Sequence, residues 1–315
     1  MVAETILLPR RMLLGGAAAL LANPALAIPR NRDPLDGVSA ASESVQMSLA
    51  SLDGSHQLVA RLCRYPGANR AWLWVQLLTP DGFFARYDHH LPTGPEKTRL
   101  EAKDVLYAVG GMTARRMGER LKPTSCHADV RARLAATGAP REGEGHIPFH
   151  AKLSLNPTRR YAGLLPGRSE LFGLGEMDIE LNGRRFRGPA TGQFHEQPQE
   201  TPRFNQPYSY ASLWGPDSSI TAIAGASGGG GYRATDSGST DFRGARFTET
   251  GDSRTLILGA PGASLEVTAE VRARQQIPIF SGLWRGQFVK AKAGGETLYG
   301  VFVDFDMPST PAAQT

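Results

Sequence analysis

Hydrophobic and polar residues alternate along much of this chain. In residues 263–273 (ASLEVTAEVRA), Leu265 and Val271 would lie on one face, and Glu, Thr and Arg residues would occupy the other. A period of two residues is typical of a strand with one buried and one solvated face. Residues 70–79 and 298–305 show related patterns, so we expect strands there as well.

Turn signals separate these runs. Asn182-Gly183 splits GEMDIEL from RRFRG, as the two-residue loop of a β-hairpin would. The 36 glycines and 22 prolines leave few segments with a helical pattern, and residues 127–137 fit either a short helix or a strand. Strands and helices do not alternate, so the sequence predicts an all-β protein with two antiparallel β-barrel-like domains packed together and little helix.

Polar segments rich in Gly and Pro at residues 139–147 and 156–167 suggest where the domains meet. We expect an N-terminal domain over residues 38–155, a C-terminal domain over residues 156–308 and a disordered tail over residues 309–315. The absence of a short sequence repeat argues against a propeller or solenoid.

The first 27 residues have the features of an export signal. Arg10-Arg11 precedes an apolar run over residues 12–22, and Ala25-Leu26-Ala27 supplies small residues at a cleavage site. The paired arginines indicate the twin-arginine route. A transmembrane anchor is the alternative, but this run is rich in Gly and Ala and shorter than the roughly 20 apolar residues that span a bilayer. We therefore expect a periplasmic or secreted protein.

The charge of the chain is modest and dispersed. The formal net charge of +5 becomes +4 once Arg10, Arg11 and Glu4 are removed with the signal. Nucleic-acid-binding proteins concentrate basic residues in one patch, and no such run exists here. We expect no nucleic-acid partner and at most peripheral contact with anionic lipid, and the sequence leaves the oligomeric state open.

The chain has two cysteines, Cys63 and Cys126. An oxidising compartment would permit a disulfide between them. Their spacing does not show whether the two sulfurs meet, so both the bridged and the free state stay open.

Several segments occur in an order that resembles a known family. The second half contains a Gly-Glu strand (residues 175–181), the Asn-Gly hairpin, a polar segment (GQFHEQPQETPRF, residues 192–204) and an aromatic strand ending in Trp-Gly (residues 208–215). The first half adds an aromatic strand followed by Pro-Asp-Gly (residues 68–82). This layout is similar to that of the lipocalin-like double-domain proteins, which include carotenoid 1,2-hydratases, kievitone hydratase and tocopherol-cyclase-like proteins.

The resemblance implies two lipocalin-like barrels and a hydrophobic small-molecule substrate. In the hydratases, the polar segment carries an Asp-His pair followed by a tryptophan and a glycine. Here it reads Phe194-His195-Glu196-Gln197-Pro198, so the acid follows the histidine and the tryptophan is missing. The specific hydratase chemistry therefore does not carry over.

His195 and Glu196 are the candidate catalytic residues. If the segment is extended, their side chains point to opposite faces, so only one would enter a pocket. His195 is the better candidate because imidazole titrates near neutral pH. The alternative is an exposed loop in which both side chains are solvated.

The candidate substrate-binding residues follow. Tyr208, Tyr210 and Trp214 share one face of the next predicted strand, a face too polar for an ordinary core and too aromatic for an ordinary surface. Packing against a neighbouring sheet would explain the same pattern.

Three further candidates lie after the glycine run at residues 228–231. Tyr232, Arg233 and Asp236 could supply polar groups at the rim of a pocket.

Asp88-His89-His90 is the other dense polar cluster. Both residue types bind metals, but consecutive residues of a strand diverge, and a site needs three or four converging ligands. We expect no metal and no other cofactor, because nucleotide and redox motifs are also missing.

Three functions fit the sequence. The first is a cofactor-independent hydratase, dehydratase, cyclase or isomerase that acts by acid–base chemistry on a terpenoid, polyene or phenolic substrate. The second is a non-catalytic carrier of a hydrophobic ligand, and the third is a metal-dependent enzyme that uses the Asp88 region. We favour the first, because His195 and Glu196 adjoin the aromatic strand.

The export hypothesis predicts that the mature protein begins close to Ile28, because signal cleavage follows small residues such as Ala25 and Ala27. N-terminal sequencing of the protein recovered outside the cytoplasm checks this. A mature protein that retains Arg10-Arg11 would overturn the hypothesis.

Overall fold

The alternating runs form two large antiparallel sheets in the computed structural model, which describes residues 41–93, 103–226, 228–279 and 282–307. All of these residues belong to a single compact unit. The predicted export signal and the predicted tail at residues 309–315 lie outside the described residues. Among those residues, no helix is long and apolar enough to cross a membrane.

Ten strands from the first part of the described chain form the first sheet, in the order β4-β3-β2-β1-β10-β9-β8-β7-β6-β5. They are β1 (Ser42–Ser51), β2 (Gln57–Tyr65), β3 (Arg70–Thr79), β4 (Gly82–Leu91), β5 (Val105–Val109), β6 (Met112–Glu119), β7 (Lys122–Leu134), β8 (Ile147–Ala162), β9 (Ser169–Leu181) and β10 (Arg184–Gln199). A 3₁₀ turn, Pro66–Ala68, joins β2 to β3.

The remaining nine described strands form the second sheet, in the order β14-β13-β12-β11-β19-β18-β17-β16-β15. They are β11 (Tyr208–Trp214), β12 (Ser218–Gly225), β13 (Gly228–Thr235), β14 (Gly238–Phe242), β15 (Gly244–Thr250), β16 (Ser253–Ala260), β17 (Ala263–Ile279), β18 (Gly282–Ala293) and β19 (Glu296–Asp306).

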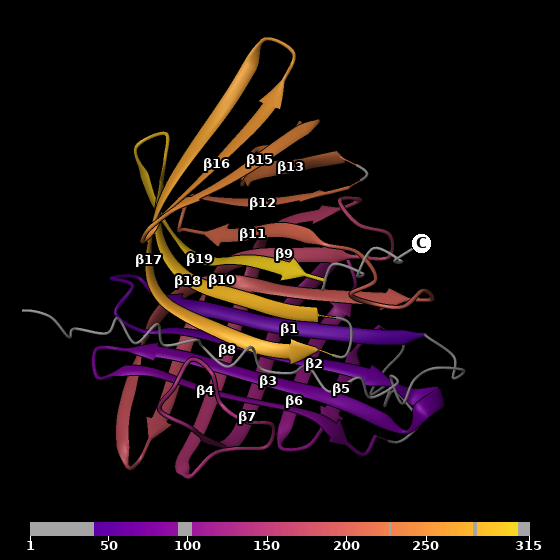
Figure 1. Cartoon of the computed structure of the whole chain (residues 1–315), viewed down its shortest axis with the longest axis vertical. Coiled ribbons are helices and arrows are strands. Elements are labelled where there is room, and N and C mark those ends of the chain that lie inside the picture. Colours follow the sequence, from indigo (N-terminus) through magenta and orange to yellow (C-terminus); the bar gives the residue numbers. More distant parts are fainter. Residues whose placement is uncertain (1–40, 94–102, 227, 280–281, 308–315) are drawn as a thin grey trace, which may run out of the picture. The chain divides into compact units, whose positions relative to one another are not determined.

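Both sheets curl into nearly closed barrels, which confirms the predicted fold class (Figure 1). In the first sheet, Ala85 of β4 and Ala135 next to β7 exchange two backbone hydrogen bonds of 2.9 Å and bring distant strands together. In the second sheet, β13 and β15 lie side by side. Barrel closure removes exposed sheet edges, which would otherwise pair with other chains.

Local sequence explains the hairpin between β9 and β10. Asn182 and Gly183 both adopt positive φ angles, 50° and 79°. A two-residue hairpin turn of this kind needs positive φ at both positions, which Asn and Gly tolerate best. The hairpin predicted at this dipeptide is confirmed.

Residues 127–137, which fitted a helix or a strand, lie mostly in β7 and its end. The predicted boundary between residues 155 and 156 falls inside β8, which continues to Ala162. The chain passes from the first sheet to the second between Gln199 and Tyr208. Residues 139–147 form the loop that leads into β8. Residues 156–167 contain the end of β8 and the turn that follows it. Both polar segments therefore connect strands of the first sheet and do not separate two domains.

Strand β3 shows how the two barrels pack. Leu73 and Val75 point into the core of the first barrel, whereas Trp72 and Trp74 join a second cluster with Trp284 of the second sheet. The strand is therefore buried on both faces. The outer face of the first barrel forms an aromatic interface with the second sheet.

A β-bulge gives β17 the same double role. The register with β18 shifts between Val271 and Ala273, and Figure 1 shows the strand bending sharply along its length. Val271 faces the core of the second barrel, whereas Ile277 and Ile279 face the interface. One extra residue in a strand reverses the face of every residue beyond it, so a simple period of two could not predict this change.

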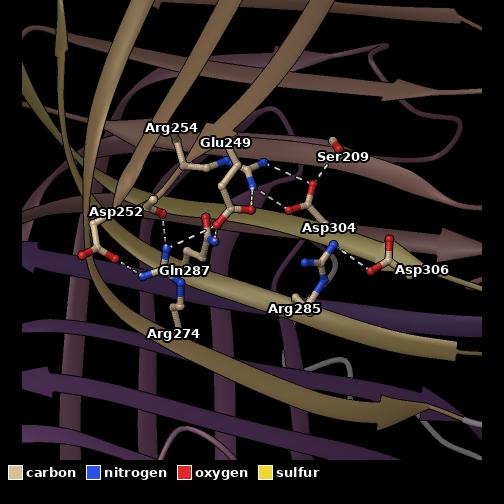
Figure 2. Close-up of polar contacts among 10 residues, drawn as sticks. Ser209, Glu249, Asp252, Arg254, Arg274, Arg285, Gln287, Asp304 and Asp306 are labelled. Carbon is tan, nitrogen blue, oxygen red and sulfur yellow. Dashed lines mark hydrogen bonds and ion pairs between the residues drawn. The ribbon is translucent and has the colours of Figure 1, made fainter. Parts of the chain in front are cut away.

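A charged network links neighbouring strands β15 to β19 of the second sheet (Figure 2). Arg254 contacts Asp304 at 2.7 Å and Glu249 at 2.8 Å, and the Glu249 carboxylate also accepts a hydrogen bond of 2.7 Å from Gln287. Arg274 bridges Glu249 and Asp252. These charges are paired with one another, as charges at buried positions must be, so the network is interpreted as structural.

The cysteines are both free and both buried. Cys63 belongs to the interface cluster, whereas Cys126 lies in the core of the first barrel. The two thiols therefore face opposite sides of the first sheet, which explains why no bridge forms.

Candidate functional site

A cavity of about 160 Å³ lies at the interface between the two barrels. Five aromatic side chains dominate its apolar wall. They are Trp74, Phe204, Tyr208, Tyr210 and Trp284. The rings of Trp74 and Trp284, one from each sheet, have centroids 5.1 Å apart.

Four lining residues form a row across the first sheet. His195 of β10 is paired with Gln46 of β1, Gln46 with Arg61 of β2, and Arg61 with Trp74 of β3. Directly paired residues of neighbouring strands project from the same face. Three consecutive strands and the distant β10 therefore present side chains to one cavity.

His195 and Glu196 point to opposite faces of β10, as the extended segment predicted. His195 lines the cavity and is 3% exposed. Glu196 points into the first barrel, where Tyr107 Oη donates a hydrogen bond of 2.7 Å and Arg116 Nε a second of 2.7 Å. The structure therefore places only His195 at the cavity.

The polar centre of the site is Glu170 at the start of β9. Its carboxylate accepts hydrogen bonds from Arg168 (2.8 Å), Gln193 (2.7 Å) and the Tyr232 hydroxyl (2.6 Å). The Tyr210 hydroxyl lies 3.4 Å from the same carboxylate. Glu170 is 1% exposed, and burial of a carboxylate requires this degree of pairing. The donors come from both sheets, so Glu170 joins the two barrels.

Arg168 links Glu170 to the cavity. Its Nη2 also donates a hydrogen bond to the Tyr210 hydroxyl and lies 3.3 Å from His195 Nδ1. Sequence reasoning did not identify this pair. The only sequence signal for this pair is that Arg168 and Glu170 are two positions apart at the start of a mostly apolar strand, so their side chains would share one face.

The contact with Arg168 fixes the state of His195. A guanidinium only donates hydrogen bonds, so Nδ1 accepts and the ring proton lies on Nε2. Burial lowers the pKa of His195 well below its ordinary value, and the nearby charges of Arg168, Arg61 and Arg203 lower it further. His195 is therefore a neutral imidazole that offers an N–H donor.

Tyr210 offers a second donor. Burial raises the pKa of its phenol to about 12, with Glu170 adding to the shift and Arg168 opposing it. Burial likewise raises the pKa of Tyr208 to about 12. Both phenols are protonated at neutral pH and line the cavity.

Trp214 and Tyr232 lie behind the cavity wall. Trp214 continues the face of Tyr208 and Tyr210 along β11, but it packs with Phe172 and Tyr232 in a separate buried cluster. Tyr232 supports the site indirectly through its hydrogen bond to Glu170. Neither side chain is among those that line the cavity.

Arg233 and Asp236 lie away from the cavity. Arg233 forms a 2.6 Å ion pair with Glu296, and the Asp236 carboxylate accepts a hydrogen bond of 3.0 Å from Thr158. Arg233 and Asp236 both follow the glycine run, but their side chains do not meet at one site. Strand β13 pairs with β12 on one side and β14 on the other, and the two side chains contact different residues.

Asp88, His89 and His90 diverge, as consecutive strand residues do. Asp88 pairs with Arg86 and His90 with Glu142, whereas His89 Nε2 accepts a hydrogen bond of 2.9 Å from the Trp74 indole. In the part of the chain that the structure describes, no three His, Cys, Asp or Glu side chains gather as metal ligands would.

No protein-family model and no curated protein matches this sequence. Solved structures do share its fold. One is CghA with Sch210972, at 9% identity and a TM-score of 0.50 over 85% of this chain and 88% of that chain. Kievitone hydratase from Nectria haematococca also matches, more weakly, at 9% identity and a TM-score of 0.46 over 91% of this chain and 94% of that chain. The resemblance to the lipocalin-like double-domain proteins is confirmed at the level of the fold.

The position of Glu196 predicts a structural role. Glu196→Gln should lower the free energy of unfolding by about 3 kcal/mol, because it leaves the buried Arg116 charge without its counter-ion. The exposed Glu176, paired with Arg187, supplies a matched control, and Glu176→Gln should have a negligible effect. Urea unfolding of the three proteins measures the difference. Unchanged stability with loss of ligand binding would assign Glu196 to the site.

The state of His89 predicts a dependence of stability on pH. Burial, followed by the charges of His90, Arg61 and Arg70, lowers the pKa of His89 to about 3. As the pH falls below about 6.5, His89 therefore binds a proton in the unfolded chain before it does so in the folded chain. Stability is complete above the ordinary histidine pKa and falls as the pH drops from about 6.5 towards about 3.

His89→Gln keeps an acceptor for the Trp74 indole but cannot be protonated. Between about pH 7 and about pH 4.5, this variant should lose on the order of 2 kcal/mol less stability than the parent. Urea denaturation at both pH values provides the comparison, with the exposed His146→Gln as control. The same pH dependence in all three proteins would refute the prediction.

Proposed function

We propose that this protein catalyses a hydration, dehydration, cyclisation or isomerisation of a hydrophobic small molecule in the cavity between the barrels, without a cofactor. One observation carries the proposal. Two hydrogen-bond donors, Tyr210 Oη–H and His195 Nε2–H, adjoin an aromatic cavity and are oriented by the buried Arg168–Glu170 pair.

The donors suit a substrate oxygen. A neutral imidazole and a phenol can stabilise negative charge that develops on a carbonyl, enolate or phenolate oxygen. The phenol of Tyr210 can also transfer its proton, since Arg168 stabilises the phenolate that would remain. Orientation by a buried ion pair lowers the reorganisation that such a step requires.

The charged side chains that line the cavity are positive, and this favours some of the candidate substrates over others. Arg61, Arg168 and Arg203 line the cavity, and no aspartate or glutamate is among the lining residues. This field stabilises an anionic transition state and opposes a carbocation. We therefore favour a phenolic or carbonyl-bearing substrate over a polyene hydrocarbon that would react through a cation.

A non-catalytic carrier is the second candidate. His195 Nδ1 faces Arg168, and the Glu170 carboxylate is occupied by donors, so neither is free to accept a proton from a ligand. That observation favours binding without chemistry. The same cavity and aromatic wall would serve both functions.

The place of action rests on the sequence. The features of residues 1–27 support export, so we propose that the protein acts in the periplasm or outside the cell on a small molecule. We propose neither a nucleic-acid partner nor more than peripheral membrane contact.

The test begins with the molecule that co-purifies with the protein, identified by mass spectrometry, and with an assay of its conversion. Tyr210→Phe should reduce turnover by about 10²–10⁴, and His195→Gln by about 10²–10³, with little change in ligand affinity. Tyr87→Phe changes a tyrosine of the interface cluster that does not line the cavity, and it should leave turnover unchanged.

Each other result has a definite meaning. Near-full turnover in both site variants would reject Tyr210 and His195 as the reacting groups. Ligand binding without turnover in the parent protein would establish the carrier function.

A further inference from the structure

The arginines of the cavity are not equally neutralised. Arg168 has Glu170 as its counter-ion at 2.8 Å. Arg61 and Arg203 form no ion pair with any carboxylate in the described residues. Burial of a cation without a counter-ion is costly, so the two charges call for an explanation.

Arg61 is held firmly by uncharged groups. Its Nε donates a hydrogen bond of 3.1 Å to Ser44 Oγ, and its guanidinium carbon lies 4.9 Å from the Trp74 ring centroid and 5.7 Å from that of Phe204. Within the described part of the chain, its two terminal nitrogens have no hydrogen-bond partner. The planar end of Arg61 is therefore oriented, lines the cavity and retains unused donors.

Arg203 adds a second charge from the segment between β10 and β11. It donates to Ser42 Oγ at 2.8 Å and to the Gln197 carbonyl at 2.5 Å, and both acceptors are neutral. Burial lowers the pKa of Arg61, and the charge of Arg203 lowers it further. The lining of the cavity therefore includes two cations close enough to repel one another.

We propose that the ligand of this cavity carries a carboxylate, bound by the free donors of Arg61 and neutralised by Arg61 and Arg203 together. The inference rests on the proposed function, which places a ligand oxygen at His195 and Tyr210. Arg61 lies two strands away from His195 along the paired row, a separation of roughly 10 Å from two interstrand spacings. The ligand thus has an oxygen at one end and a carboxylate at the other.

The size of the cavity favours a carboxylate over a phosphate. The planar guanidinium fork of Arg61 matches two oxygens of either group, so the fork alone does not distinguish them. The cavity of about 160 Å³ is small for an aromatic ligand with a tetrahedral dianion.

The test compares 4-hydroxycinnamate with the neutral 4-hydroxycinnamamide by isothermal titration calorimetry on ligand-free full-length protein. Both probes carry a phenolic oxygen, and only one carries a carboxylate. The acid should bind at least about tenfold more tightly than the amide. Arg61→Gln should remove this preference and leave the affinity for the amide unchanged, while Arg61→Lys should keep part of it. The exposed Arg246→Gln is the control for net charge.

The melting temperature of the Arg61→Gln variant shows whether that variant is folded. Because Arg61 is a cation without a counter-ion, Arg61→Gln should melt no lower than the parent protein. Any one of three results overturns the proposal. The two probes could bind with equal affinity, the preference for the acid could survive Arg61→Gln, or the acid could fail to bind at millimolar concentration. Those results concern binding alone. The proposed reaction fails separately, if Tyr210→Phe and His195→Gln keep full turnover of the co-purified molecule.

Discussion

Burial of β1, β2, β3 and the second half of β10 on both of their faces is the constraint on which the rest of the structure depends. A strand sends successive side chains to opposite faces, so the buried residues 190–197 of β10 point alternately into the barrel core and towards the second sheet. Phe194 and Glu196 enter the core, whereas His195 enters the interface. The cavity exists because the outer face of one barrel is covered by the other.

The polar network around Glu170 makes this interface specific. Apolar packing between two sheets is tolerant of small shifts, but a buried carboxylate must keep its donors. Glu170 and Arg168 come from the first sheet, and Tyr210 and Tyr232 come from the second. A shift of one sheet against the other would break several charge-assisted hydrogen bonds at once. The network therefore fixes the position of Tyr210 relative to His195.

Much of the fold could be predicted because it depends on local pattern. The alternation in residues 263–273 and the Asn182-Gly183 dipeptide identify a strand and a hairpin without any distant contact. The opposite orientation of His195 and Glu196 follows from the same period. The bulge after Val271 could not be predicted, because nothing in the local composition marks the residue that loses its partner.

The centre of the site could not be predicted for a different reason. The donors to Glu170 include Gln193 and Tyr232, which are 23 and 62 positions away in the chain, so only the completed fold brings them together. Trp214 shows that a residue on the predicted face of a strand can still lie away from the cavity. It shares a strand face with Tyr210, but the face extends past the cavity into the cluster of Phe172. A sequence pattern identifies the face of a strand, and the packing of the second sheet decides which part of that face meets a cavity.

The unequal pairing of the arginines connects stability with function. Arg168 stabilises the joined sheets through its ion pair with Glu170, whereas Arg61 and Arg203 lack a carboxylate partner in the described residues and their charges are a cost. An anion in the cavity would reverse that cost and would touch the row from His195 to Arg61 on one sheet and Tyr210 on the other. Any ligand that binds only the folded protein stabilises it, and this one would do so across the interface. If the proposed anionic ligand binds, Arg61 and Arg203 would therefore couple occupation of the cavity to the stability of the joined sheets.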